Sequence, residues 1–190
     1  LFRSYVFRAA ANTNTEGRSA AVFMAKHPWK RIATIGPDYE YGQMITKAFV
    51  DWMKKIKPEA EIVHQGWPKL GETDYTPFIA PCLAAKPDAC FMSLWGGHFV
   101  TFAKQAKPYG FFEKVKVVAA GEGGSPETAM ALKDELPLGI TTNAYDVFYY
   151  PDTPEHNAYN ERLKKFTGQE YPPSWAITGY VAMQFLVEAI

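Results

Sequence analysis

Residues 31–58, RIATIGPDYEYGQMITKAFVDWMKKIKP, decide the fold class. Residues 31–36 are a short apolar run that ends at Gly-Pro-Asp, which predicts a buried strand followed by a turn. Apolar residues then recur at spacings of three and four, which predicts an amphipathic helix that ends before Pro58. Its apolar positions are Met44, Ile45, Ala48, Phe49, Trp52, Met53 and Ile56.

The same alternation of apolar runs and helical patterns extends in both directions. The predicted strands are residues 5–8, 31–36, 61–64, 89–95 and 115–119. The predicted helices are residues 15–27, 44–56, 76–83 and 99–106. The third of these helices is opened by Thr76 as its N-cap, followed by Pro77, and runs through Leu83. Nearly continuous apolar strands that alternate with helices are typical of α/β proteins. We therefore predict a parallel sheet covered by helices on both faces, in three layers.

The pattern changes after residue 138. Residues 139–150, GITTNAYDVFYY, predict one long extended run, and helices at 155–166 and 175–190 follow without a strand between them. These two helices have apolar faces, so we expect them to pack on a sheet formed by chain outside this sequence. The sequence begins at Leu1 without Met and stops within an apolar-periodic stretch, so we expect a piece of a longer protein.

Composition narrows the class of protein. The 190 residues are 47% hydrophobic and 15% aromatic, as in globular proteins. Twenty Lys and Arg balance 20 Asp and Glu, and no basic cluster occurs, which argues against a nucleic-acid partner. No apolar run approaches the roughly 18 residues that a membrane span needs.

Metal, cofactor and catalytic motifs are absent from the sequence. The four histidines are scattered, so no metal site is predicted. The GEGG stretch at residues 121–124 lacks the spacing of a dinucleotide-binding loop, and no cofactor or catalytic residue is predicted. Cys82 and Cys90 are compatible with one disulfide in an oxidising compartment or with two buried apolar residues.

Three loops follow predicted strands and therefore share the carboxyl edge of the sheet, where open α/β sheets bind ligands. Their candidate binding residues are Tyr39, Tyr41, Trp95, Gly96, Gly97 and Glu122. Aromatic faces, accessible backbone, helix N-termini and one carboxylate suit a small molecule with an apolar or aromatic body and a charged end. A structural interpretation also stands: Gly36 and Gly42 as turn residues, Tyr39 and Trp95 as a cover for the sheet, and Glu122 as a solvated first-turn carboxylate.

An ordered set of motifs resembles the type I periplasmic solute-binding proteins, and more narrowly the leucine/isoleucine/valine-binding branch of ABC-transporter receptors. The motifs are YVFR (5–8), IGPDYEYG (35–42), DYT (74–76), KPD (86–88), WGG (95–97), GEG (121–123), YP (150–151) and GY (179–180). They extend over essentially all 190 residues.

The resemblance implies a two-lobe clamp with crossover segments at its hinge. Residues 1–8 would be one crossover and residues 9–139 a complete α/β second lobe. Residues 140–146 would be the return crossover, and residues 147–190 two helices of a partial first lobe. Family ligands lie between the lobes.

The resemblance also assigns roles to candidate residues. Tyr41 would contact the ligand, Trp95, Gly96 and Gly97 would form another wall, and Glu122 would hold the ligand's ammonium group. The family has a smaller or tyrosine-type residue where Trp95 stands, which leaves room for an aromatic acid. The expected ligand is a branched-chain or other apolar amino acid, or an aromatic acid.

The expected function is therefore extracytoplasmic capture of a small organic solute and its delivery to an ABC-transporter membrane permease. The expected location is periplasmic, or extracellular and membrane-anchored in a Gram-positive source. Two alternatives are an enzyme with the same α/β organisation, whose candidate groups would be Glu122, Asp38 and His98, and a ligand-binding sensor domain of a receptor or regulator with the same clamp. The enzyme would need a nucleophile and base, or a metal, so we expect a protein without enzymatic activity.

Overall fold

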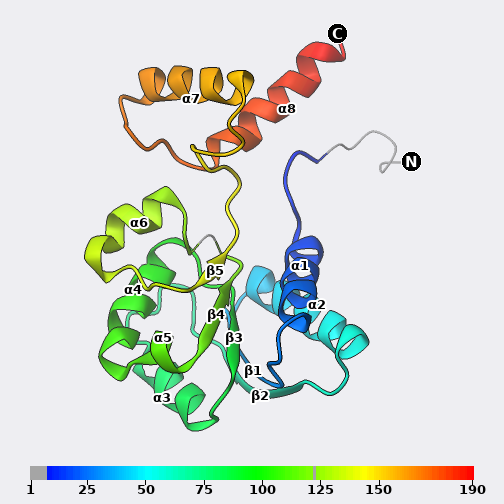
Figure 1. Cartoon of the computed structure of the whole chain (residues 1–190), viewed down its shortest axis with the longest axis vertical. Helices are drawn as coiled ribbons and strands as arrows, with labels where there is room; N and C mark the ends of the chain where they lie inside the picture. The colour runs from blue at the N-terminus through cyan, green and yellow to red at the C-terminus, as the bar shows by residue number, and fades with distance from the viewer. Residues whose placement is uncertain (1–7, 122) are drawn as a thin grey trace. The chain divides into compact units, whose positions relative to one another are not determined.

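The computed structural model describes residues 8–121 and 123–190 (Figure 1). These residues divide into two compact units. The first, here called the sheet unit, contains Asn12–Gly124 and Thr128–Asn143. The second, here called the helical unit, contains the described residues 8–11 together with Ser125–Glu127 and Ala144–Ile190. The predicted strand at 5–8 lies, apart from Arg8, outside the described residues.

The sheet unit is built on a five-stranded sheet in the order β2-β1-β3-β4-β5, with every pairing parallel. The strands are β1 (Arg31–Ile35), β2 (Glu61–Gly66), β3 (Ala89–Met92), β4 (Lys116–Ala119) and β5 (Thr141–Thr142). The parallel α/β fold predicted from the sequence is confirmed. The predicted strand at 89–95 is too long, because pairing of β3 with β1 ends at Met92.

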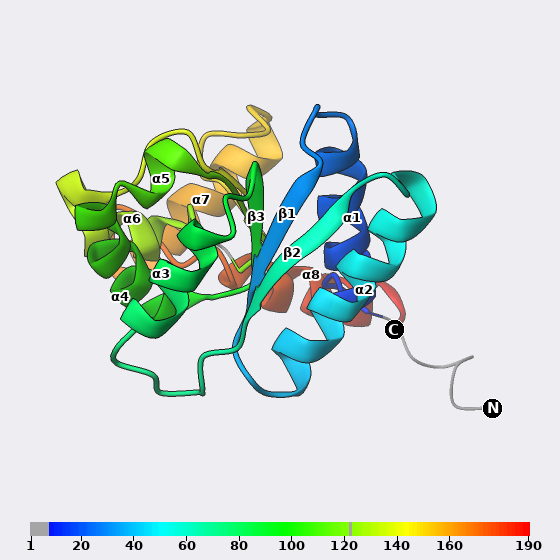
Figure 2. The ribbon, with the colours of Figure 1, turned by 90° about the horizontal axis from the view of Figure 1, so that it is seen from below.

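Helices cover both faces of this sheet, as Figures 1 and 2 show. One face packs on α1 (Thr13–Ala25) and α2 (Glu40–Ile56), and the other on α3 (Thr76–Ala84), α4 (Gly96–Ala106) and α5 (Phe111–Lys114). Alternate strand residues supply the two cores: Ile32, Phe91 and Val118 face α1 and α2, and Ala33, Met92 and Ala119 face the other helices. Shorter helices are η2 (Lys107–Tyr109), α6 (Pro126–Leu132) and η3 (Lys133–Glu135).

Two local predictions are wrong. Thr76 is not the N-cap of α3: Tyr75 holds that position without a side-chain capping bond, and the Asp74 carboxylate accepts the Thr76 N–H at 2.9 Å. Residues 139–150 are not one extended run, since β5 has two residues and Val147 bridges to Tyr150 across a turn. The Thr142 hydroxyl accepts the Gly124 N–H and donates to the Asn143 carbonyl, and such local bonds compete with a longer strand.

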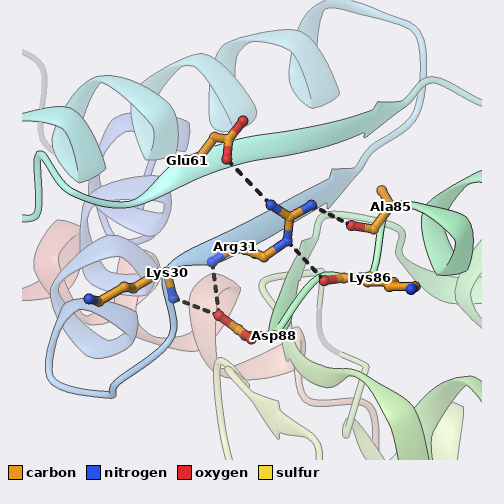
Figure 3. Close-up of polar contacts among 6 residues, drawn as sticks. All are labelled: Lys30, Arg31, Glu61, Ala85, Lys86 and Asp88. Atoms are coloured by element: carbon orange, nitrogen blue, oxygen red, sulfur yellow. Dashed lines mark hydrogen bonds and ion pairs between the residues drawn. The ribbon is translucent and has the colours of Figure 1, made fainter.

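The KPD motif at residues 86–88 fixes the end of the sheet where the strands begin, opposite to their carboxyl ends (Figure 3). The Asp88 carboxylate accepts the backbone N–H groups of Lys30 and Arg31 at 2.7 and 2.9 Å. The Arg31 guanidinium donates to the carbonyls of Ala85 and Lys86 at 2.8 and 3.2 Å, at the end of α3. This motif therefore joins α3 to the start of β1 and has a structural role.

Asp88→Asn should lower the free energy of unfolding at pH 7 by about 1 kcal/mol, because a carboxylate accepts N–H groups more strongly than an amide. The N–H groups of Arg31 and Lys30 lower the pKa of Asp88 in the folded protein. A lowered folded pKa stabilises the protein above the unfolded value of about 3.9, and that contribution is lost as the pH falls through the folded pKa. Urea unfolding from pH 7 to pH 2 should thus show the two proteins converging in acid; a constant difference would contradict the assignment.

Both cysteines are buried free thiols in the core that α3, α4 and the sheet enclose: Cys82 belongs to α3 and Cys90 to β3. Burial raises the pKa of the Cys90 thiol, and the adjacent Cys82 thiol raises it further. Unfolding the non-reduced protein should release two thiols that react with a titrating disulfide reagent. Release of none would show that the pair is bridged.

The helical unit contains α7 (Pro154–Thr167) and α8 (Ala176–Glu188), close to the predicted bounds. The Thr153 hydroxyl accepts the His156 N–H and caps α7. No residue of α8 is buried, and its second half exposes Phe185, Leu186 and Val187. Over the described part of the chain, no helix is long and apolar enough to cross a membrane.

Candidate functional site

The candidate site lies where the strand order reverses. From β1 the chain goes to β2 on one side, and β3 pairs with β1 on the other side. The helices after β1 and β3, α2 and α4, therefore cover opposite faces. In open α/β sheets a ligand-binding crevice lies at this position, outside the carboxyl ends of the two strands. Residues 36–39 follow β1 and residues 93–95 follow β3 at this end of the sheet.

Tyr39 and Trp95 meet at this end of the sheet. The Trp95 indole N–H donates to the Tyr39 hydroxyl at 3.0 Å. Each residue is the N-cap of its helix, Tyr39 of α2 and Trp95 of α4, and each has extended backbone and no side-chain capping bond. Trp95 remains 44% exposed, so an aromatic surface at the sheet edge is accessible to solvent in the sheet unit.

Tyr41 lies beside this pair in the first turn of α2. It is half-buried, and its ring centroid is 6.0 Å from that of Tyr39. It packs at the margin of the core formed by α1, α2 and the sheet. The structure therefore brings together Tyr39, Tyr41 and Trp95, which the sequence placed in two separate loops.

Gly96 and Gly97 continue from Trp95 as the first residues of α4. A Cβ at either position would meet no atom within 4 Å, and Gly96 has a φ of +51°. A ligand can thus approach the backbone of this turn closely, and its N–H groups lie at a helix N-terminus. Glu122, the remaining predicted ligand contact, lies outside the described residues.

Gly36, Gly42 and Gly121 serve close packing. A Cβ on Gly36 would lie 2.4 Å from the Ser93 hydroxyl, one on Gly42 2.0 Å from the Pro37 carbonyl oxygen, and one on Gly121 2.3 Å from the Leu94 carbonyl oxygen. All three are buried. Gly36 lies in the loop after β1, where its close packing gives a steric reason for glycine. Gly42 lies within the first turn of α2, so its interpretation as a turn residue is wrong. They bring the loops after β1, β3 and β4 into contact with their neighbours.

A partly buried polar network at the same edge was missed as a unit by sequence reasoning. The Tyr75 hydroxyl and the His98 Nδ1 are 2.7 Å apart, and the Gly71 N–H donates to the His98 Nε2 at 3.2 Å. Burial, with the Glu72 charge, raises the pKa of Tyr75 to about 12, so its hydroxyl stays protonated. Its signal in the sequence was the DYT motif at 74–76.

No group of three or more metal-ligating side chains occurs among residues 8–121 and 123–190. What the edge offers is aromatic surface, open backbone and two helix N-termini. These groups can bind a small molecule by stacking, hydrogen bonding and attraction of an anionic group.

Comparison with known proteins gives the family. The sequence model of the family described as periplasmic binding protein matches residues 2–190. This chain therefore belongs to the periplasmic binding protein family. A search of curated proteins found no match.

Solved structures share the fold. A solute-binding protein of an ABC transporter from R. palustris, in complex with benzoate, has a TM-score of 0.81 and 21% identity, covering 94% of this chain and 48% of that one. The leucine-binding protein LivK from Thermotoga maritima has a TM-score of 0.75 and 18% identity, covering 94% and 49%. A solute-binding protein from Rhodopseudomonas palustris BisB5, in complex with 3,4-dihydroxybenzoic acid, has a TM-score of 0.73 and 22% identity, covering 98% and 50%. This chain spans about half the length of these proteins.

Proposed function

We propose that the full-length protein is an extracytoplasmic solute-binding receptor that captures a small organic ligand in a two-lobe clamp and delivers it to an ABC-transporter permease. The single observation that carries the proposal is the Trp95–Tyr39 hydrogen bond at the β1/β3 crevice. It joins two predicted ligand residues at the position where open α/β sheets bind ligands. Membership of the periplasmic binding protein family supports the same function and a non-enzymatic role.

The proposed ligand is a branched-chain or other apolar amino acid, or an aromatic acid. Tyr39, Tyr41 and Trp95 would contact its apolar body, and Gly96 and Gly97 would admit it close to the backbone. The indole of Trp95 is larger than an aliphatic ligand needs and stacks well on a benzoate ring. One similar solved structure is a complex with benzoate and another is a leucine-binding protein, so both ligand classes belong in the first tests.

The lobe assignment is part of the proposal. Residues 9–139 would form one lobe, with crossovers at 1–8 and 140–146, and residues 147–190 would belong to the other lobe. The exposed apolar side chains of α8, among them Phe185 and Val187, are what helices of an incomplete lobe would present. A periplasmic location, or an extracellular and membrane-anchored one in a Gram-positive source, follows from the proposed role.

A thermal-shift screen on the full-length protein tests this function. The panel contains leucine, isoleucine, valine, phenylalanine, benzoate, 4-hydroxybenzoate and 3,4-dihydroxybenzoate. A ligand at a hundredfold excess over its dissociation constant stabilises the folded protein by about 2.7 kcal/mol. Stabilisation by one chemical class and release of the unchanged compound support a receptor. Chemical conversion of a bound compound would identify an enzyme instead.

Glu122→Gln separates the two ligand classes. If Glu122 holds an ammonium group, the substitution removes a charge-assisted bond worth roughly 1.5–3 kcal/mol, and an amino acid should bind about ten- to a hundredfold more weakly. Benzoate, which has no amine, should bind nearly as before. Calorimetric titration of both variants measures this, and an amino acid that binds them equally would exclude the ammonium role.

A further inference from the structure

We propose that His98 is a positioning residue of this edge, which holds the first turn of α4, and with it Trp95, against the loop that follows β2. The proposal rests on the proposed function, because it explains how the wall formed by Trp95, Gly96 and Gly97 is kept in place before a ligand arrives. His98 itself would make no ligand contact.

Within the first turn of α4, Phe99 is fully buried, whereas the two residues next to Trp95 have little packing of their own. Atoms added at Gly96 and Gly97 would meet nothing within 4 Å, and Trp95 supplies no capping bond. His98 is the next residue, and its backbone N–H donates to the Trp95 carbonyl at 3.1 Å. Holding the His98 side chain therefore holds the turn that carries Trp95.

Both ring nitrogens of His98 are used, and the contacts define its tautomer. Nε2 accepts the Gly71 N–H at 3.2 Å, so this nitrogen carries no proton. In a neutral ring the proton is then on Nδ1, which donates to the Tyr75 hydroxyl at 2.7 Å. One side chain thus binds the loop after β2 at Gly71 and the entry to α3 at Tyr75.

Tyr75 is a rigid support for His98. It is fully buried, and its ring packs edge-on against Phe102 at 5.7 Å. Its N–H donates to the Gln105 side-chain oxygen at 2.7 Å, and the Gln105 amide donates to the Thr73 carbonyl at 2.8 Å. Residues 73–75 are therefore bound to α4 at two places, near His98 and near its end.

The loop after β2 also contacts the loop after β1, which carries Tyr39. The Asp38 N–H donates to the Pro68 carbonyl at 2.7 Å, directly before Tyr39. The loop after β2 is thus hydrogen-bonded to both neighbouring segments, to Asp38 through Pro68 and to His98 through Gly71. The Trp95–Tyr39 bond joins these two segments directly. The carboxylates of this loop bond locally: Glu72 accepts backbone N–H groups of its own segment, as Asp74 does.

Nuclear magnetic resonance of the ¹⁵N-labelled full-length protein tests the inference without any ligand. Long-range ¹H–¹⁵N correlation should show His98 protonated on Nδ1 and unprotonated on Nε2. The Trp95 indole signal, assigned with Trp95→Phe, should have an order parameter near 0.85, and His98→Ala should lower it below about 0.6. Tyr75→Phe, which removes one hydroxyl, should lower it in the same direction. His27→Ala is the matched control, because it removes a histidine ring that stacks on Trp29, a different tryptophan. It should leave the order parameter of the Trp95 indole unchanged.

Two results would overturn the positioning role: a His98 ring protonated on Nε2, or a Trp95 indole equally ordered in wild type and in both His98→Ala and Tyr75→Phe. A compound from the panel that binds wild type should bind His98→Ala about tenfold more weakly, because a smaller fraction of the protein has the wall in place. If no compound binds wild type, the proposed function fails, whereas the tautomer and the indole order parameter still decide the role of His98.

Discussion

His156→Ala should lower the free energy of unfolding by about 3–5 kcal/mol, because it leaves a buried carboxylate without its partner. The His156 Nε2 and an Asp146 carboxylate oxygen are 2.8 Å apart, and their side chains are only 9% and 13% exposed. Asn160, one turn along α7, donates to the Phe148 carbonyl at 3.1 Å. The His156–Asp146 pair and the Asn160 bond thus fix the segment before α7 to that helix, within the helical unit.

A matched pair on the same helix gives the control. The Lys164 Nζ and the Glu161 Oε1 are 3.2 Å apart, but the Glu161 side chain is 74% exposed. Glu161→Gln should therefore change the free energy of unfolding by less than about 0.5 kcal/mol. Replacing both buried partners by leucine should cost much less than removing His156 alone, since no charge is then left buried. Urea unfolding of the full-length variants measures all three. A His156→Ala cost below about 1 kcal/mol would show that the pair behaves like a surface contact.

Gly42→Ala should destabilise the protein by about 3 kcal/mol, against the usual stabilisation when alanine replaces glycine inside a helix. The added Cβ would lie 2.0 Å from the Pro37 carbonyl oxygen and 2.9 Å from the Pro37 nitrogen. These are backbone atoms, so either the start of α2 or the loop after β1 must move. Tyr39 and Tyr41 lie in that segment, and ligand affinity should therefore fall as well.

Gly179→Ala is the control for this prediction. Gly179 lies within α8, where an added Cβ meets no atom within 4 Å. It should stabilise its helix by roughly 0.5–1 kcal/mol. Urea midpoints that move in opposite directions for the two glycines would support the packing argument. A Gly42→Ala protein as stable as wild type would contradict the close approach of Gly42 to Pro37.

The fold was predictable because its signals are local and repeated. The apolar period of residues 44–56 identifies α2, and the short apolar runs at 31–36 and 115–119 identify β1 and β4. The start of α2 at Glu40 was not predictable, because the loop residues before Met44 carry no apolar period. The prediction of an extended run at residues 139–150 was wrong, because the strand-favouring residues there pair with a neighbouring strand at only two positions.

The candidate site was predictable only in part. Parallel strands place Tyr39 and Trp95 at one edge, which the sequence indicates. Their direct bond requires β1 beside β3, and strand order depends on pairing between distant segments. The sequence indicated His98 as a scattered histidine and as a candidate group of an enzyme, but not its contact with Tyr75, which lies 23 residues earlier in the chain. Sequence periodicity carries no information about such a contact.

We expect a small organic ligand to bind at the β1/β3 edge, against Tyr39, Tyr41 and Trp95. A crystal structure of the full-length protein with the panel compound that stabilises it most tests this directly. We predict ligand density in van der Waals contact with the Trp95 ring, with ligand atoms close to the backbone of Gly96 and Gly97. A compound that binds tightly but lies elsewhere, with these aromatic side chains exposed to solvent, would contradict the account.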